Sequence, residues 1–349
     1  MATGFPTKAN WSAGDLLTAS QMDDLAGTVN VLQNSNYPVA AGKNALINGN
    51  FDIWQRGTSS SATSGYLTAD RWYCYSGGAI TWSQETTTVP SGSRYCMKML
   101  TAASVQPILY QAIETANAII YAGQSVTLST QIQASVSTGY TLDIQYSTSV
   151  DVGIAGSWTT ITATSGGTGT AVSGSFTTVS GVYAIPSTAK SLMVRVYPTL
   201  PVASGVSLYV GKIQMELGTV VTNFARNGGT LQGEVAACRY YYRRTTGDAT
   251  ALYQQMTGTG YAADTANVTC PVIFDTPMRA TPSSVEYSTL RLSDGTNAPT
   301  VINITITSVL SNKFAIALNV STSAATQFRP YALQGNNSAS AYLGWSAEL

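Results

Sequence analysis

The sequence contains no histidine in its 349 residues. Histidine is the commonest general base and metal ligand, so its absence excludes a Ser-His-Asp site, a Cys-His site and any zinc site built on imidazole. A P-loop, a nucleophile elbow and a DxDxDG calcium run are missing as well. We therefore expect no catalytic, cofactor-binding or metal-binding residues, and predict that the chain is not an enzyme.

Charge is scarce too. Lys and Arg number 17, Asp and Glu number 17, and charged residues make up only 10% of the chain. Soluble domains ordinarily carry about a quarter. A net charge of zero argues against a partner such as nucleic acid or an anionic membrane surface. A neutral surface of hydroxyl and amide side chains suits β-rich extracellular assemblies and subunit interfaces, where a buried charge would cost desolvation energy.

Long apolar runs are absent. No stretch approaches the roughly 18 apolar residues of a membrane span, so we expect no membrane insertion. The opening residues MATGFPTKANWSAGD lack the basic region and apolar core of a secretion signal. This pattern predicts synthesis in the cytoplasm without export by a standard signal.

The four cysteines, Cys74, Cys96, Cys238 and Cys270, lie far apart and show no CxxC spacing. Three disulfide pairings are open, and the sequence does not choose among them. We favour free buried thiols, because a chain of this length needs no covalent cross-links to build a core.

Residues 1–43 read as an N-terminal connecting segment. Thr18 and Gln21 fit a capping box at the start of a helix. The apolar residues that follow are spaced as the seam of a short coiled coil: Met22, Leu25, Val29 and Leu32. Such a helix is marginal alone. It either packs on the neighbouring domain or, as we favour, associates with copies of itself, most plausibly as a trimer. Residues 33–43 read as a linker.

Residues 44–224 predict a β-sandwich, because short strands alternate with turn residues at close intervals. Apolar and polar residues alternate in 125–135, 142–146 and 192–197, and 208–217 is the expected last strand. The run SGGTGTAVSGS at 165–175 predicts a flexible loop. The stretch Asn44–Trp72 is expected to supply the opening strand and first loop, with Trp72 in the core and Asp70 and Arg71 fixing a turn.

Residues 225–349 predict a short helix followed by a smaller β domain. Leu231, Val235, Cys238 and Tyr242 recur at helical spacing, and a strand is expected to start near Arg243. Further strands are expected at 266–274, 284–287, 301–306, 313–320 and 338–349. In the third of these, alternation places Ile302, Ile304 and Ile306 on one face.

Several segments resemble a family of bacteriophage virion proteins. They are NALINGNFDIWQRG, TADRW, YQAIE with AGQSVTLSTQIQAS, and IQMELGTVVTNFARNGG followed by EVAACRYYYRR. The opening WSAGDLLTASQMDDLAGTVN also resembles attachment segments of phage fibres. Members are usually tail fibre, tail-tip or other structural proteins with a carbohydrate-binding-like jelly roll. The family often has an acidic residue and Pro-Phe-Glu where this chain has Val221-Thr-Asn-Phe224, so no role is carried over to that hinge.

The resemblance implies an all-β chain with a short N-terminal helix, a jelly-roll β-sandwich, a short linking helix and a second, smaller C-terminal β domain. It directs attention to aromatic and planar polar residues, which recognise sugar rings and their hydroxyls. Most of those in Asn44–Trp72 are expected to serve packing. The candidates for glycan contact are Trp82, Trp158, Trp54, Arg56 and Tyr75.

The function expected on this basis is that of a phage tail fibre or tail-tip protein. It would be located in the virion, joined to other virion proteins through residues 1–40, and would contact host-surface polysaccharide through its β domains. One alternative is a decoration or scaffold protein of the head or tail with no receptor role. Another is a glycan-cleaving depolymerase with two carboxylates placed by the fold, which we disfavour because no β-helix repeat is visible.

Overall fold

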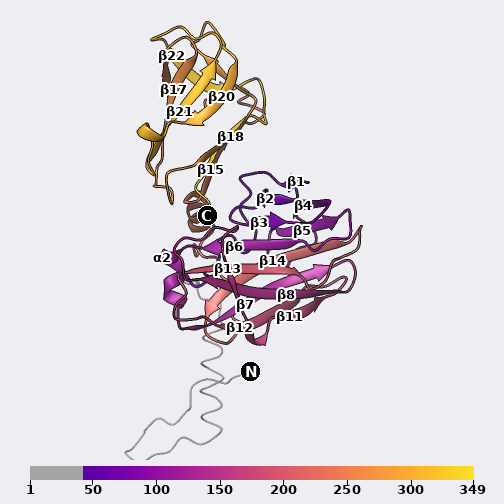
Figure 1. Cartoon of the computed structure of the whole chain (residues 1–349). Coiled ribbons are helices and arrows are strands. Elements are labelled where there is room, and N and C mark those ends of the chain that lie inside the picture. The colour runs from indigo at the N-terminus through magenta and orange to yellow at the C-terminus, as the bar shows by residue number, and fades with distance from the viewer. Residues whose placement is uncertain (1–41) are drawn as a thin grey trace, which may run out of the picture.

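The computed structural model describes residues 42–349 (Figure 1). The helix expected from Thr18 and its seam of Met22, Leu25, Val29 and Leu32 lie outside the described residues. Within 42–349 strands dominate, as the sequence predicted, and no helix there is long and apolar enough to cross a bilayer.

The first part of the described chain forms two antiparallel sheets. The first sheet runs, in spatial order, β1 (Ser59–Ser60), β4 (Ile80–Glu85), β5 (Cys96–Thr101), β14 (Ser207–Leu217), β7 (Ser125–Ala134), β12 (Thr177–Ala184) and β10 (Ala163–Gly166). The second runs β11 (Thr168–Ala171), β8 (Thr138–Ser147), β13 (Ser191–Pro198), β6 (Ile108–Ile113), β3 (Tyr73–Tyr75) and β2 (Ser64–Tyr66), with β9 (Thr159–Ile161) also paired to β8. Two short helical turns, α2 (Thr115–Ala118) and η1 (Ile119–Tyr121), follow β6.

The two sheets share one apolar core, which confirms the predicted sandwich. Alternate residues of each strand point inward, as the period of two in a strand requires. Leu192, Val194 and Val196 of β13 are buried, as are Val126 and Leu128 of β7. The four strands expected from alternation in this part, at 125–135, 142–146, 192–197 and 208–217, are all present.

Two local predictions for the sandwich are wrong. The stretch Asn44–Arg56 is not a strand but a run of turns and extended chain, and Asn48 and Phe51 adopt positive φ angles of 58° and 54°. This backbone conformation prevents the regular hydrogen bonds of a β-strand, and the side chain of Asn48 replaces them. Its amide N–H groups donate to Ile53 O and Asp70 O, and its amide oxygen accepts from Ile53 N, all at 2.8 to 3.0 Å. The expected loop at 165–175 instead contains parts of β10 and β11, because glycines at positive φ allow the turn between them.

The linking helix α3 (Leu231–Arg239) begins at Thr230, whose hydroxyl accepts a hydrogen bond from Gly233 N. It ends before Tyr242, which already belongs to β15, so the helix is shorter than the apolar spacing suggested and the strand begins where expected.

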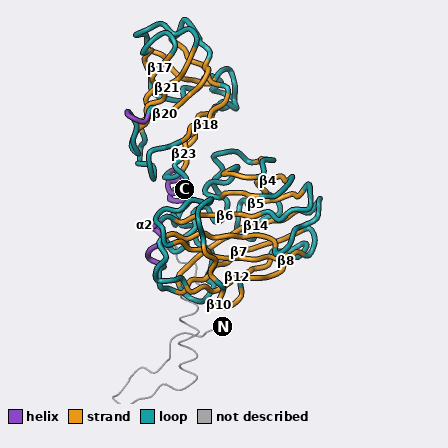
Figure 2. Tube along the Cα trace, in the orientation of Figure 1, coloured by secondary structure: helices purple, strands orange, loops and turns teal. Residues whose placement is uncertain are grey.

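The remaining strands form a second β region with its own core (Figures 1 and 2). A three-stranded sheet joins β15 (Tyr242–Thr246), β23 (Tyr342–Ser346) and β18 (Ser284–Ser288). A six-stranded sheet orders β19 (Leu290–Ser293), β22 (Pro330–Gly335), β16 (Gly260–Ala262), β17 (Asn267–Ile273), β21 (Ala315–Thr322) and β20 (Val301–Ile306), and η2 (Ser308–Leu310) follows β20. The prediction for β20 is wrong in one respect. A bulge between Val301 and Asn303 turns Ile302 outward while Ile304 stays buried.

A buried cluster of charged and aromatic residues joins the sandwich to the second region. The guanidinium of Arg71 is paired with the Glu348 carboxylate and lies 3.5 Å from the ring centre of Tyr241. Arg56 also reaches Glu348, at 3.4 Å, and stacks 3.5 Å over Tyr242. All three charged side chains are at most 5% exposed. The resembling segments Asn44–Arg56 and TADRW therefore build a junction. All four cysteines are free and buried, as favoured from the sequence.

Asp70 lies beside this cluster, and we predict that it gives the fold a pH dependence. Burial raises the pKa of Asp70 from 3.8 to about 6, against the opposing effects of Arg56 and Gln55. A carboxyl whose pKa is higher in the folded chain stabilises the fold at low pH, and this stabilisation is lost as the pH rises from about 4 to about 6. Two units correspond to about 3 kcal/mol.

The measurement is the free energy of urea unfolding of wild type and Asp70→Asn between pH 4 and pH 7. Wild type should lose on the order of 2–3 kcal/mol relative to the variant as the pH rises through this window. Burial raises the pKa of Glu114 and Glu234 as well. Both remain in the variant, so the difference between the two proteins isolates Asp70. Parallel profiles would contradict the assignment.

Candidate functional site

A continuous row of polar and aromatic residues crosses the outer face of the second sheet. Strand register places Tyr66 opposite Tyr73, Tyr73 opposite Tyr110, Tyr110 opposite Arg195, and Arg195 opposite Asp143. The row thus spans β2, β3, β6, β13 and β8. Four inter-strand spacings make it roughly 19 Å long. We call these five residues the tyrosine row.

Strand alternation explains why the row faces outward. In β13 the apolar Leu192, Val194 and Val196 fill the core, so Arg195 and Tyr197 must point to the other side. The same parity holds in β3, where Cys74 is buried between two outward tyrosines. The row is therefore a direct consequence of the pattern that builds the core.

The tyrosine rings are packed edge to face. Tyr66 and Tyr73 lie 5.3 Å apart at 89°, and Tyr73 and Tyr110 lie 6.1 Å apart at 79°. This is a preferred arrangement for aromatic pairs, and it holds each ring in one orientation. All three tyrosines are partly exposed residues, so the row presents aromatic surface to solvent. The ring of Tyr66 also lies 5.3 Å from the Arg56 guanidinium of the junction.

A charged pair closes the row at β8. Arg195 donates Nε–H to Asp143 Oδ1 at 2.8 Å and a second N–H to Oδ2 at 2.6 Å. Tyr197 donates its hydroxyl to the same Oδ2 at 2.9 Å. Burial, reinforced by the Asp143 carboxylate, raises the pKa of Tyr197 to about 12, so the hydroxyl stays protonated at neutral pH. The two hydrogen bonds to one carboxylate hold the guanidinium in one orientation and leave its remaining donors outside this pair.

The row can bind but is poorly suited to hydrolysis. Aromatic faces and fixed planar donors beside them suit the apolar side and the hydroxyls of a sugar ring. Two-carboxylate glycoside hydrolysis needs a second acid, and the row holds one carboxylate, Asp143, which already accepts three hydrogen bonds. Among residues 42–349 no group of three or more cysteine or acidic side chains is placed to hold a metal ion.

Of the candidates chosen from sequence, Tyr75 lies on this face. It neighbours the row in β3, is 43% exposed and pairs with Ile108. Trp82 is a core residue of β4. It is 0% exposed, and its indole N–H donates to Ala62 O at 3.0 Å. Trp82 was chosen as a candidate for glycan contact, but inward parity in β4 places it in the core, where it has no exposed surface.

The other three candidates are also away from the row. Trp54 is half-buried against the sandwich core and bonds Phe51 O. Arg56 is buried in the junction. Trp158 lies half-buried in the segment between β8 and β9, where its indole N–H donates to Gly153 O at 3.1 Å. Ligand contact by these residues stays a prediction.

None of the five residues of the row was among the candidates chosen from the sequence: Tyr66, Tyr73, Tyr110, Arg195 and Asp143. The alternation in 142–146 and 192–197 was visible, and it already placed Asp143 and Arg195 opposite the apolar face. What local sequence lacks is register. Asp143 and Arg195 stand 52 positions apart in the chain, and only the alignment of β8 against β13 pairs them. Alternation along each strand identifies Asp143 and Arg195 as outward-facing polar residues, but it does not tell which strands lie side by side.

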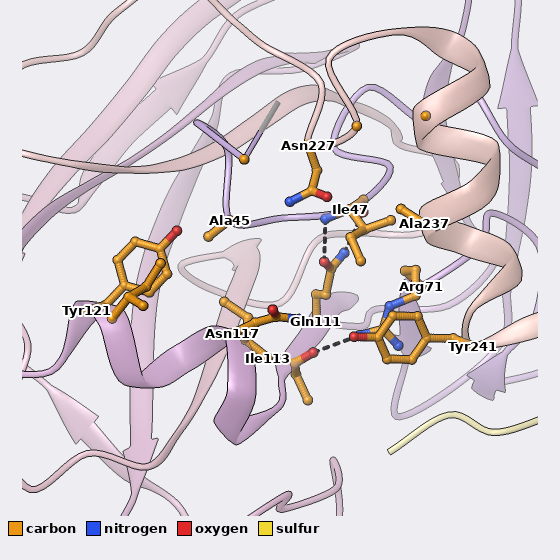
Figure 3. Close-up of a pocket in the computed structure, with 15 residues that line it drawn as sticks. Ala45, Ile47, Arg71, Gln111, Ile113, Asn117, Tyr121, Asn227, Ala237 and Tyr241 are labelled. Atoms are coloured by element: carbon orange, nitrogen blue, oxygen red, sulfur yellow. Dashed lines mark hydrogen bonds between the residues drawn. The ribbon is translucent and has the colours of Figure 1, made fainter. Parts of the chain in front are cut away.

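A hollow of about 420 Å³ lies between α3, the segment after Gly42 and the end of β6 (Figure 3). Its polar groups are already used by the protein. Gln111 accepts from Ile47 N and donates to Ile47 O, both at 2.8 Å, and Arg71 donates to Ala112 O at 2.8 Å. We therefore regard the tyrosine row, whose aromatic faces remain partly exposed, as the better candidate site.

No family model matches the chain, and no curated protein matches it. The solved structures that resemble it include the CBM22-1 xylan-binding domain of Xyn10C from Paenibacillus barcinonensis, at 10% identity and a TM-score of 0.33, covering 52% of this chain and 99% of that one. The C-terminal family 22 carbohydrate-binding module of Clostridium thermocellum Xyn10B is 17% identical, with a TM-score of 0.34, and the match covers 52% of this chain and 98% of that module. A putative sugar-binding protein of Bacteroides thetaiotaomicron is 14% identical, with a TM-score of 0.34, and the match covers 50% of this chain and all of that protein.

Proposed function

We propose that the chain is a non-enzymatic structural protein of a bacteriophage virion that binds host-surface glycan through the tyrosine row. The observation that carries glycan binding is the row itself, with its packed, partly exposed tyrosines beside a guanidinium that Asp143 holds by two hydrogen bonds. The virion context is supported by the segments that resemble phage tail fibre and tail-tip proteins. On this proposal residues 1–40 attach the chain to other virion proteins.

The glycan proposal predicts a large effect of Tyr110→Ala. Tyr110 is the middle of the row and contacts the neighbouring ring on one side and Arg195 on the other. Its loss should weaken binding at least tenfold, which corresponds to about 1.4 kcal/mol. The measurement is affinity electrophoresis or calorimetry of the full chain against a panel of bacterial capsular polysaccharides and lipopolysaccharides.

The matched control is Tyr209→Ala. Tyr209 is a partly exposed tyrosine of β14 on the first sheet, so the same substitution is made on the opposite side of the sandwich. It should leave binding unchanged. Equal binding by both variants, or no binding by wild type to any member of the panel, would contradict the proposal. Release of reducing ends during the incubation would contradict the non-enzymatic part.

A scaffold or decoration role without receptor binding is the second candidate. The observation in its favour is a set of well-exposed apolar side chains in the second β region, among them Ile273, Val309, Phe314 and Phe328, since such residues are typical of subunit contacts. Immunogold labelling of virions with an antibody to this chain separates the two. Label at the distal tail favours receptor binding, label along the head or tail surface favours the scaffold, and unlabelled particles contradict both.

A further inference from the structure

An apolar groove lies where the described chain begins. It measures about 470 Å³, and its lining includes Gly42, the ion pair of Lys43 with Glu216, and the apolar Ile120, Leu217 and Val220. These three apolar side chains are 61%, 56% and 66% exposed. Large apolar side chains gathered around one depression mark a surface that another element covers.

The groove is also the exit point of the N-terminal segment. Gly42 lines it, and Gly42 N donates to Asn227 O at 2.7 Å, which fixes the position of the chain there. Gly42, Ile120 and Tyr121 are shared with the hollow of Figure 3, so the two depressions adjoin on either side of this point. Any element encoded shortly before Gly42 therefore starts out next to exposed apolar surface.

The sequence predicts such an element. The seam residues Met22, Leu25, Val29 and Leu32 are separated from Gly42 by residues 33–41. Those residues span at most about 33 Å when extended, which is ample for a helix to fold back onto the groove. Two elements joined by about nine residues meet at an effective concentration on the order of millimolar, so docking within the chain is favoured over association between chains in dilute solution.

We propose that residues 18–32 form a helix whose seam docks in this groove of the same chain. Each partner needs the other. The helix is too short to be stable alone in water, and the groove exposes apolar surface that the helix would cover. In this arrangement the helix packs on the neighbouring domain, which is the first of the two alternatives left open by the sequence. It does not associate with copies of itself as a trimer. Docking of residues 18–32 on the same chain narrows the attachment role proposed above for residues 1–40 to residues 1–17.

The test is hydrogen exchange of the full chain with a matched pair of variants. Val29→Asp places a carboxylate in the seam, whereas Val31→Asp makes the same change two residues on, on the opposite side of a helix. Val29→Asp should speed exchange of peptides covering 118–122 and 215–221 several-fold, and Val31→Asp should leave it unchanged. Neither position belongs to the described fold, so the sandwich remains intact in both variants.

The reciprocal pair tests the groove. Val220→Asp should abolish the exchange protection of residues 22–32. Val136→Asp, at an exposed valine beyond the other end of β7, should preserve it. Protection should also be independent of dilution, with a monomer mass by light scattering. Equal effects of Val29→Asp and Val31→Asp on the groove would overturn the proposal. So would protection lost on dilution, or an oligomer that Val29→Asp dissociates without changing exchange at the groove, since a second copy would then supply the helix.

Discussion

Replacing Arg71 by alanine is expected to lower the free energy of unfolding by about 3–5 kcal/mol. The guanidinium is 2% exposed and Glu348 is 5% exposed, so the substitution leaves a buried carboxylate short of its main partner. It also removes the bond to Ala112 O and the stacking on Tyr241. The measurement is urea unfolding followed by tryptophan fluorescence.

The control for this prediction is Arg94→Ala. Arg94 is an exposed arginine that also lies near a tyrosine ring, at 4.9 Å from that of Tyr95, and its loss should change stability by no more than about 0.5 kcal/mol. The double variant of Arg71→Ala with Glu348→Ala should cost less than the sum of its parts, because it removes the stranded charge. An Arg71→Ala chain as stable as Arg94→Ala would show that the junction contributes little.

Trp82→Ala is expected to cost about 3–5 kcal/mol of stability, as for other large core aromatics. Trp82 is 0% exposed among the apolar residues that join the two sheets, and its indole N–H is satisfied by Ala62 O. Trp158→Ala makes the same substitution at a half-buried position and should cost about 1 kcal/mol. Urea midpoints of the sandwich transition compare the two.

Trp82→Phe separates a packing role from ligand contact. It keeps most of the ring volume and should fold, while glycan binding by the tyrosine row should be unchanged. A Trp82→Phe chain that folds like wild type but no longer binds polysaccharide would restore Trp82 as a contact residue. It would also show that the buried position of this side chain is not the binding-competent one.

The stretch Asn44–Trp72 shows how a conspicuous composition can mislead. It gathers two tryptophans, two arginines and two aspartates, which are the residue types of a sugar site. The structure uses most of them internally. Trp72 donates its indole N–H to Asn48 O at 2.9 Å, and Asp70 accepts the Gln55 backbone N–H at 3.0 Å. Buried polar groups need partners, and here that need accounts for the segment without any ligand.

Much of the fold could be predicted from the sequence, because burial of one face of a strand makes apolar and polar residues alternate along it. This holds for β7, β8, β13 and β14, and for β17 and β21 in the second region. The failures fall where local conformation departs from that period. Positive φ at Asn48 and Phe51 removed the expected opening strand, and a bulge at Val301 reversed the direction of Ile302.

The candidate site was readable only in part. Tyr75 was chosen and lies on the same face as the tyrosine row, whereas Tyr110, Arg195 and Asp143 were not chosen. The sequence by itself determined the all-β class and the absence of imidazole chemistry, because composition and periodicity are local properties. Only the tertiary structure decided which residues form the tyrosine row and which form the junction. The physical reason is that strand register and domain contact bring together residues far apart in the chain, and no local pattern records that proximity.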